Sequence, residues 1–144
     1  MKKVLLGILV VGVLILLAGF LTPLILRSEK KTGLAEAMHN MKQLYLHLID
    51  YEQKVGNFPK DLKDLVTEGH IDTETFGKLN QAETSSGNKP FGYISGYKTT
   101  DDPNTIILYL PEPIDGKRVF LRIDGSVKQY LEEDFKALLM QQEE

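Results

Sequence analysis

The hydrophobic residues of this chain follow three successive patterns, and the first is an unbroken apolar run from Val4 to Leu26. These 23 residues carry no charge, and 17 of them are Val, Leu, Ile or Phe. At about 1.5 Å per residue, a helix of this length crosses the ~30 Å hydrocarbon layer of a bilayer. The run has no polar face, so it predicts a helix that spans the membrane. We therefore expect residues 1–26 to be a membrane anchor whose first partner is the lipid bilayer.

Two basic residues, Lys2 and Lys3, precede the run, as they do in a secretory signal peptide. The run is much longer than the roughly 7–15 apolar residues of such a signal. For a cleavage after Ala18, position −3 would be Leu16, which is too large. A lipoprotein signal requires a cysteine, and the chain has none. We predict an uncleaved signal anchor. Basic residues nearly balance on its two sides, so the positive-inside rule leaves the orientation open.

In the second pattern, apolar residues recur at steps of three and four. The stripe consists of Leu34, Ala37 or Met38, Met41, Leu44, Leu48 and Tyr51. This period predicts an amphipathic helix from about Lys30 to Lys54, ended by Gly56-Asn57. We expect the stripe to be the face by which this helix packs on its own domain. The alternative is that the stripe forms a coiled coil with a partner.

Two shorter helical segments are predicted next. One runs from Asp61 to about Glu68, with Asp61 as its capping residue. In the other, Asp72 caps a turn that contains Phe76 and Leu79.

The third pattern is the alternation of apolar and polar residues typical of β-strands. A polar stretch, 80–90, precedes it and is predicted to be a surface loop. Four strands are then expected, at Phe91–Tyr97, Thr105–Leu110, Val119–Ile123 and Ser126–Tyr130. Asp124-Gly125 between the last two is a strong hairpin signal, and a short helix should follow from Leu131 to Met140. This order predicts an α+β fold in which a long helix packs on a small antiparallel meander.

Composition narrows the class of function. Beyond Leu26 the chain has 15 basic and 20 acidic residues, a net charge of −5. Nucleic-acid-binding proteins normally present a basic surface, so we expect no nucleic-acid partner. Residues 27–144 suffice for one modest core, which makes them a single domain beside the anchor. The absence of cysteine excludes disulfides, thiolate metal sites and a cysteine nucleophile.

Five short motifs occur in order along the chain. They are Leu21-Thr22-Pro23-Leu24 with Arg27-Ser28-Glu29-Lys30, Asn40-Met41-Lys42-Gln43-Leu44, Asn57-Phe58-Pro59 with Leu62 and Leu65, Val119-Phe120-Leu121 with Asp124-Gly125-Ser126-Val127, and Glu132-Glu133-Asp134-Phe135-Lys136-Ala137-Leu138. Together they resemble type IV pilin-like proteins, and among these the major pseudopilins of type II secretion. The resemblance implies a pilin-like fold in which the transmembrane helix continues into the amphipathic helix. It also implies a bacterial inner-membrane location with residues 27–144 in the periplasm.

The start of the chain departs from this family. Pilin-like proteins carry a short basic leader and then Gly-Phe-Thr-Leu-Ile-Glu, which a prepilin peptidase cuts after the glycine. Here the nearest dipeptide, Gly19-Phe20, lies deep in the apolar run, and no glutamate follows it five residues on. The resemblance implies that this glutamate pairs with the amine of a neighbouring subunit, because a buried charge without a partner is strongly unfavourable. We therefore expect an anchored monomer, small oligomer or accessory protein, and not the main subunit of a long fibre.

Candidate chemical sites are few. Because major pseudopilins bind calcium in their C-terminal β region, the resemblance draws attention to five oxygen-bearing residues. They are Asp101, Asp102, Asn104, Asp115 and Asp124. Calcium takes six to eight oxygen ligands, whereas these residues fall in three separate turns whose ordinary chemistry accounts for each of them. We predict no cofactor and no metal, with calcium as the alternative.

Nothing in the sequence points to catalysis. The three histidines, His39, His47 and His70, lack the spacing of a metal site, although His47 and Asp50 are close enough on a helix to interact. No Gly-x-Ser-x-Gly elbow and no glycine-rich phosphate loop occurs. We predict a non-enzymatic structural or accessory protein of a pilin-like or secretion-type assembly. The alternative is a stand-alone extracytoplasmic module that binds a small ligand or an envelope component.

Overall fold

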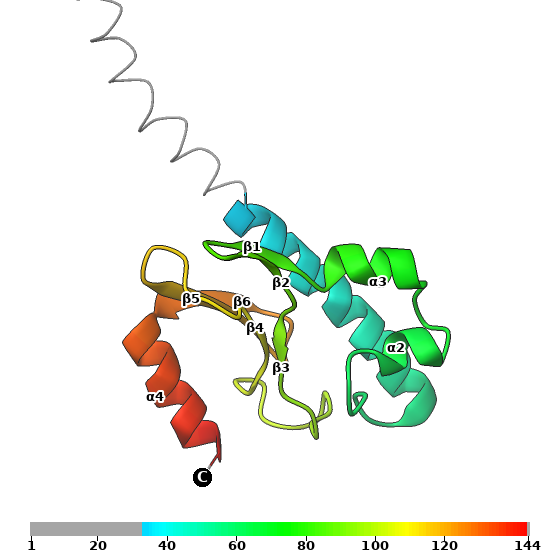
Figure 1. The fold of residues 1–144 in the computed structure, drawn as a ribbon. Helices are drawn as coiled ribbons and strands as arrows, with labels where there is room; N and C mark the ends of the chain where they lie inside the picture. Colours follow the sequence, from blue (N-terminus) through cyan, green and yellow to red (C-terminus); the bar gives the residue numbers. More distant parts are fainter. Residues whose placement is uncertain (1–32, 144) are drawn as a thin grey trace, which may run out of the picture. The chain divides into compact units, whose positions relative to one another are not determined.

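The computed structural model describes residues 33–143 of the chain (Figure 1). The main elements of this part are a long helix and a four-stranded antiparallel sheet. A second, two-stranded sheet and a C-terminal helix complete this part, so the predicted α+β class is confirmed. Within the described residues, no helix is both long and apolar enough to cross a membrane. The predicted anchor, Val4 to Leu26, lies outside them. By its internal contacts the chain divides into 1–32 and 33–144.

The first described helix covers residues 33–55, and we refer to it as helix 33–55. The stripe seen in the sequence is its buried face. The buried members are Ala37, Met41, Leu44, Leu48 and Tyr51, all within the main hydrophobic core. The helix ends at Gly56, whose φ of 95° is accessible to glycine at little cost and whose N–H donates to Glu52 O at 2.7 Å. Packing on its own domain is therefore confirmed for this helix, and the coiled-coil alternative is wrong for the stripe.

Two short helices, α2 (Asp64–Thr67) and α3 (Thr73–Leu79), follow beside helix 33–55. Asp72 caps α3 as predicted, because its carboxylate accepts a hydrogen bond from Thr75 N at 2.8 Å. The helix predicted to start at Asp61 is shorter and starts at Asp64. The Asp61 carboxylate instead accepts a hydrogen bond from Lys63 N (2.8 Å), which holds a turn before the helix.

The prediction that residues 80–90 form a loop is wrong, because this segment contains a hairpin. Strand β1 (Ala82–Thr84) pairs antiparallel with β2 (Gly87–Lys89). A distant residue, Glu112, stabilises the hairpin by accepting hydrogen bonds from Ser86 Oγ (2.7 Å) and from Lys89. The hydrogen bond from Lys89 is the main reason that the pKa of Glu112 falls to about 2. Sequence alone gives no sign of this contact, which spans more than twenty residues.

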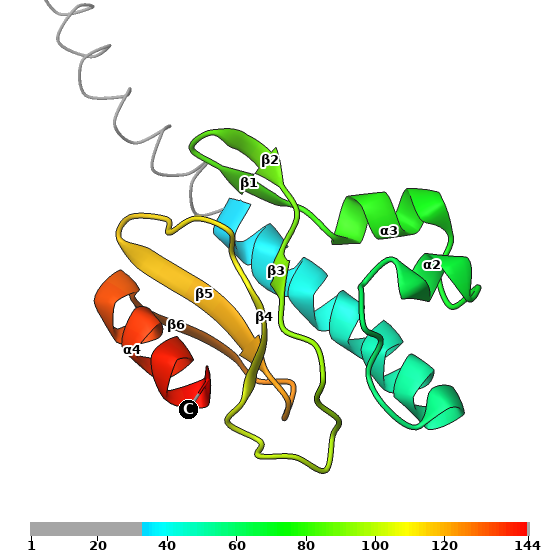
Figure 2. The same ribbon diagram turned by 60° about the horizontal axis from the view of Figure 1, so that its bottom comes forward.

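The four-stranded sheet is the predicted meander (Figure 2). Its strands lie in the order β3 (Gly92–Tyr93), β4 (Ile106–Tyr109), β5 (Lys117–Arg122) and β6 (Val127–Leu131). The predicted Asp124-Gly125 hairpin joins β5 to β6, with Gly125 at a φ of 77° and its N–H donating to Arg122 O at 3.0 Å. The first strand is much shorter than the predicted Phe91–Tyr97, because its pairing with β4 ends at Tyr93. Further on, Gly96 adopts a φ of 95°, which is not an extended conformation.

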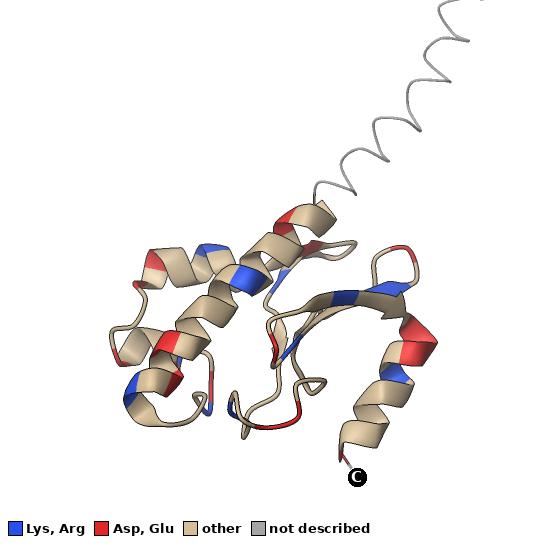
Figure 3. Cartoon of the chain, turned by 180° about the vertical axis from the view of Figure 1, so that it is seen from behind, with Lys and Arg blue, Asp and Glu red and all other residues tan. Residues whose placement is uncertain are grey.

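The sheet lies between two helical layers (Figures 1 and 2). On one face, buried residues such as Val119 and Leu121 join the core of helix 33–55. On the other face, helix α4 (Glu132–Glu143) packs through Phe135 on Ile106 and Phe120. The helix predicted at Leu131–Met140 is therefore present, starting one residue later and extending to Glu143. Figure 3 shows basic and acidic residues interspersed over the described helices and strands.

Candidate functional site

The structure brings together two of the three turns that hold the calcium candidates. Asp124 N lies 3.4 Å from Pro103 O, so the β5–β6 turn contacts the turn that contains Asp101, Asp102 and Asn104. Asp115, at a φ of 50°, lies in the turn before β5, at the opposite end of that strand. The five residues therefore do not converge on one point.

The oxygens of these turns are engaged within the protein. Asp101 accepts a hydrogen bond from Lys98 N at 2.8 Å, and Asp102 accepts from Asn104 N at 2.9 Å. Hydrogen bonding to Ser126 lowers the pKa of Asp124. The positively charged guanidinium of Arg122 also lies here, and its Nη1 donates to Asn104 Oδ1 at 3.2 Å. In residues 33–143 no three His, Asp or Glu side chains form a metal-binding group, and turn chemistry accounts for the contacts of Asp101, Asp102 and Asn104.

A buried histidine, which the spacing of residues did not single out, links helix 33–55 to the α2–α3 corner. His70 has a side chain only 6% exposed, and its Nδ1 lies 3.0 Å from Asp50 Oδ2. Its ring packs against Tyr51, with 4.9 Å between the ring centroids. Hydrogen bonds from Lys54, then from His70, lower the pKa of Asp50. The interaction considered between His47 and Asp50 is thus replaced by pairs of Asp50 with Lys54 and His70.

An open pocket of about 590 Å³ lies beside His70 and is also lined by His47, Asp72 and Thr75. The Thr75 hydroxyl and the Asp72 carboxylate are committed to capping α3, since Thr75 Oγ1 donates to Asp72 at 2.7 Å. A carboxylate–imidazole pair can orient a ring nitrogen toward a ligand. The imidazole of His70 is therefore the group in this pocket that could contact a small polar ligand.

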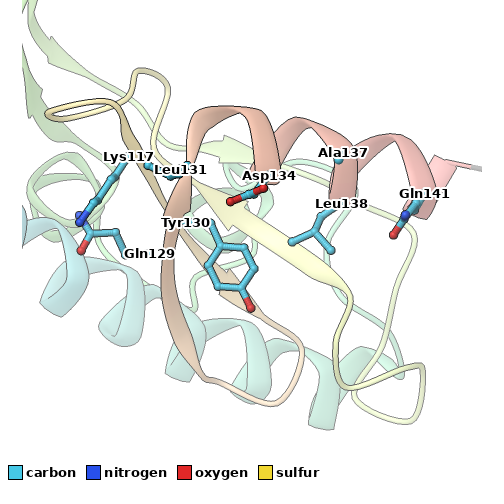
Figure 4. Close-up of a pocket in the computed structure, with 8 residues that line it drawn as sticks. All are labelled: Lys117, Gln129, Tyr130, Leu131, Asp134, Ala137, Leu138 and Gln141. Carbon is cyan, nitrogen blue, oxygen red and sulfur yellow. The ribbon is translucent and has the colours of Figure 1, made fainter.

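A second hollow, of about 530 Å³, runs between the edge strand β6 and helix α4 (Figure 4). Its walls include Gln129, Tyr130 and Leu131 of β6, and Asp134, Ala137 and Leu138 of α4. Tyr130 is 36% exposed and Leu131 47% exposed, which is high for large apolar side chains. We call this hollow the edge groove. A partly apolar surface of this kind, rimmed by polar side chains, is typical of a site that contacts another protein chain.

The start of α4 is fastened to the sheet by a partly buried ion pair. Arg118 Nε donates to Glu132 Oε2 at 2.8 Å, and Arg118 Nη1 donates to Leu110 O at 2.6 Å. The guanidinium also lies over the ring of Phe135, 5.3 Å from its centroid. Hydrogen bonding to Arg118 lowers the pKa of Glu132. These contacts fix the wall of the edge groove where α4 leaves β6.

The far end of α4 is fastened by Gln142, another residue that the sequence did not indicate. Its side-chain amide accepts a hydrogen bond from Ile106 N (2.7 Å) and donates one to Ile106 O (2.9 Å). The β4–β5 register shifts between Ile106 and Leu108. An amide side chain has the same donor and acceptor as a peptide group. Gln142 therefore satisfies the backbone groups of Ile106 where the ladder is irregular.

We expect Gln142→Glu to destabilise residues 27–144 by about 1–3 kcal/mol, because Ile106 O loses its donor and faces a carboxylate instead. The matched control is Gln141→Glu, which makes the same change at the exposed neighbouring position and should stay within about 0.5 kcal/mol of the parent. Urea unfolding of the two variants and the parent measures both effects. Equal midpoints for the two variants would show that Gln142 does not support the sheet.

Comparisons with protein-family models, with curated proteins and with solved structures find no match to this chain. The case for a function therefore rests on the motifs of the sequence and on the arrangement of the described residues.

Proposed function

We propose that this chain is a membrane-anchored, non-enzymatic protein of the pilin-like or pseudopilin-like type, serving as a structural or accessory component of a bacterial envelope or secretion-type assembly. One observation carries the proposal. An uncharged run, Val4 to Leu26, is followed by an amphipathic helix whose buried stripe packs on a four-stranded meander that ends in an Asp-Gly hairpin and a short helix. The resemblance implies this order of elements.

The motif residues that carry the resemblance also support the proposal by their positions. Phe58, which follows helix 33–55, is 2% exposed and belongs to the main core together with Leu62 and Leu65. Asn40, on the helix itself, is buried and its Nδ2 donates to Lys78 O at 3.4 Å. These residues hold the chain against helix 33–55 where it turns back along the helix.

In this proposal, residues 27–144 lie in the periplasm and the apolar run lies in the inner membrane. The partners are the lipid bilayer and subunits of the assembly. The net charge of −5 beyond Leu26, from 15 basic and 20 acidic residues, argues against a nucleic-acid partner. No catalytic role and no cofactor are assigned.

The second candidate is a stand-alone module that binds a small polar ligand. The pocket beside His70 favours it, because a buried imidazole held by Asp50 lines an open hollow. Such a protein would act without assembly partners.

Purification after crosslinking in native membranes separates the two candidates. The tagged full chain is solubilised in mild detergent, with residues 1–32 fused to an unrelated domain as the control. We expect the full chain, and not the control, to retain pilin-like or secretion-assembly subunits. If it retains none, and a small ligand raises the melting temperature of residues 27–144, the ligand-binding function replaces the proposed one.

A further inference from the structure

Within residues 33–143, the backbone groups along the outer edge of β6 have no hydrogen-bonding partner. Strand β6 pairs with β5 and is the last strand of its sheet. Arg122 N donates to Ser126 O and Glu132 N donates to Gly116 O, both at 3.0 Å, which fixes where the ladder with β5 is hydrogen-bonded. Because bonded and non-bonded pairs alternate along an antiparallel ladder, Val127, Gln129 and Leu131 turn their N–H and C=O groups away from β5. An edge of this kind can accept another strand.

The five residues of β6 are complementary to themselves in one antiparallel register. If Gln129 faces Gln129 of a second copy, Val127 faces Leu131, and Lys128 faces Tyr130. The first pair joins two apolar side chains on the face covered by helix 33–55, where Val127 already packs on the core. The second pair lies on the other face, where Tyr130 contacts Phe120, and it sets an ammonium group against an aromatic ring. Cross-strand pairs of these kinds stabilise a sheet.

We propose that β6 pairs with β6 of a second copy of this chain, antiparallel and centred on Gln129, to form a twofold dimer with a continuous sheet. The dimer uses the outward groups of three residues in each strand. It also covers exposed apolar surface at Leu131, next to the edge groove.

Lys128 selects this register over its neighbours. A lysine in the middle of an edge strand normally opposes strand addition, because like charges directly opposite each other are unfavourable. A slip of two residues in one direction brings Lys128 opposite its own copy. The opposite slip pairs only three residues of each strand. The centred register is the one that keeps the two lysines apart and pairs all five residues.

A twofold contact of this type closes on itself. Each copy contributes the same edge, so no edge of β6 is left for a third copy. The inference is independent of the proposed function, since it needs neither the anchor nor an assembly. It does agree with an expected small oligomer in place of a long fibre.

The absence of cysteine from the chain allows a direct test. In the proposed dimer, paired residues of the new ladder have Cα atoms about 5.5 Å apart, within the range that a disulfide bridges. The purified full chain in mild detergent, where the bilayer does not constrain orientation, is oxidised and examined on a non-reducing gel. We expect Gln129→Cys to form a disulfide dimer by itself. We expect Val127→Cys and Leu131→Cys to form one when mixed, and neither to do so alone.

Two further variants serve as controls. Gln53→Cys, exposed on helix 33–55, should stay monomeric on oxidation. Gln129→Lys places like charges at the twofold axis, so it should abolish dimers of the unoxidised chain in analytical ultracentrifugation while its circular dichroism spectrum stays that of the parent. The proposal is overturned if Gln129→Cys stays monomeric while its melting curve matches the parent. It is also overturned if Val127→Cys crosslinks alone as readily as in the mixture.

Discussion

Replacement of Leu44 by aspartate is expected to unfold residues 27–144. Leu44 is fully buried, at 0% exposure, in the middle of the stripe with which helix 33–55 packs on the sheet. A carboxylate at this position would have to leave water without a partner. The cost is several kcal/mol, which is comparable with the total stability of about 5–15 kcal/mol typical of a small domain. Far-ultraviolet circular dichroism during heating measures the loss.

Leu46 provides the matched control for this experiment. It lies two residues away on the same helix, and 59% of it is exposed. Leu46→Asp makes the same chemical change at the surface and should leave stability within about 0.5 kcal/mol of the parent. If Leu44→Asp melts within a degree or two of Leu46→Asp, the stripe does not hold the domain together.

Gly92→Ala is expected to destabilise the sheet by about 3 kcal/mol, at the upper end of the range for an overpacked core. Gly92 pairs across the ladder with Tyr109, whose ring lies directly over the glycine. A Cβ at this position would lie 2.6 Å from Tyr109 Cε1 and nearer still to Cζ and Cε2 of the same ring. The ring has little room to move away, because it also contacts Phe135, with 5.6 Å between centroids. Urea unfolding measures the change.

Two companion variants test this explanation. Gly77→Ala changes a glycine within α3 that has no atom within 4 Å of a new Cβ, so it should stabilise the helix by about 0.5–1 kcal/mol. In a Tyr109→Ala background, Gly92→Ala should cost far less than in the parent, because the clashing ring is gone. An equal cost in both backgrounds would mean that the ring is not the cause.

The features that the sequence predicted well are those set by local chemistry. Helix 33–55 follows from a periodic stripe, and its end follows from Gly56. The Asp72 cap and the Asp124-Gly125 hairpin depend on residues within three positions of each other. Such signals need no knowledge of the rest of the fold.

The errors occur where distant contacts decide the structure. Residues 80–90 look like a loop because few of their side chains are apolar, yet Glu112 holds them as the β1–β2 hairpin. Strand β3 was predicted too long because apolar and aromatic residues continue to Tyr97, whereas the pairing with β4 ends at Tyr93. Propensity and pattern are weak guides when tertiary contacts compete with them.

The side-chain contacts at the candidate sites join residues that are even farther apart in the sequence. Asp50 and His70 are 20 residues apart, and Gln142 reaches Ile106 across 36 residues. No spacing rule connects either pair. For the five calcium candidates the sequence misleads in the other direction. Their side chains are of types that bind a metal, but the fold divides them between the two ends of β5.

The proposed function depends most directly on the anchor and on the side of the membrane that the domain occupies. Protease added to intact spheroplasts, with the full chain tagged at its C-terminus, tests both. We expect residues 27–144 to be digested without lysis, while a cytoplasmic control protein stays intact and the tagged chain sediments with the membranes beforehand. A domain that stays protected until the membrane is lysed, or a chain recovered in the soluble fraction, would contradict it.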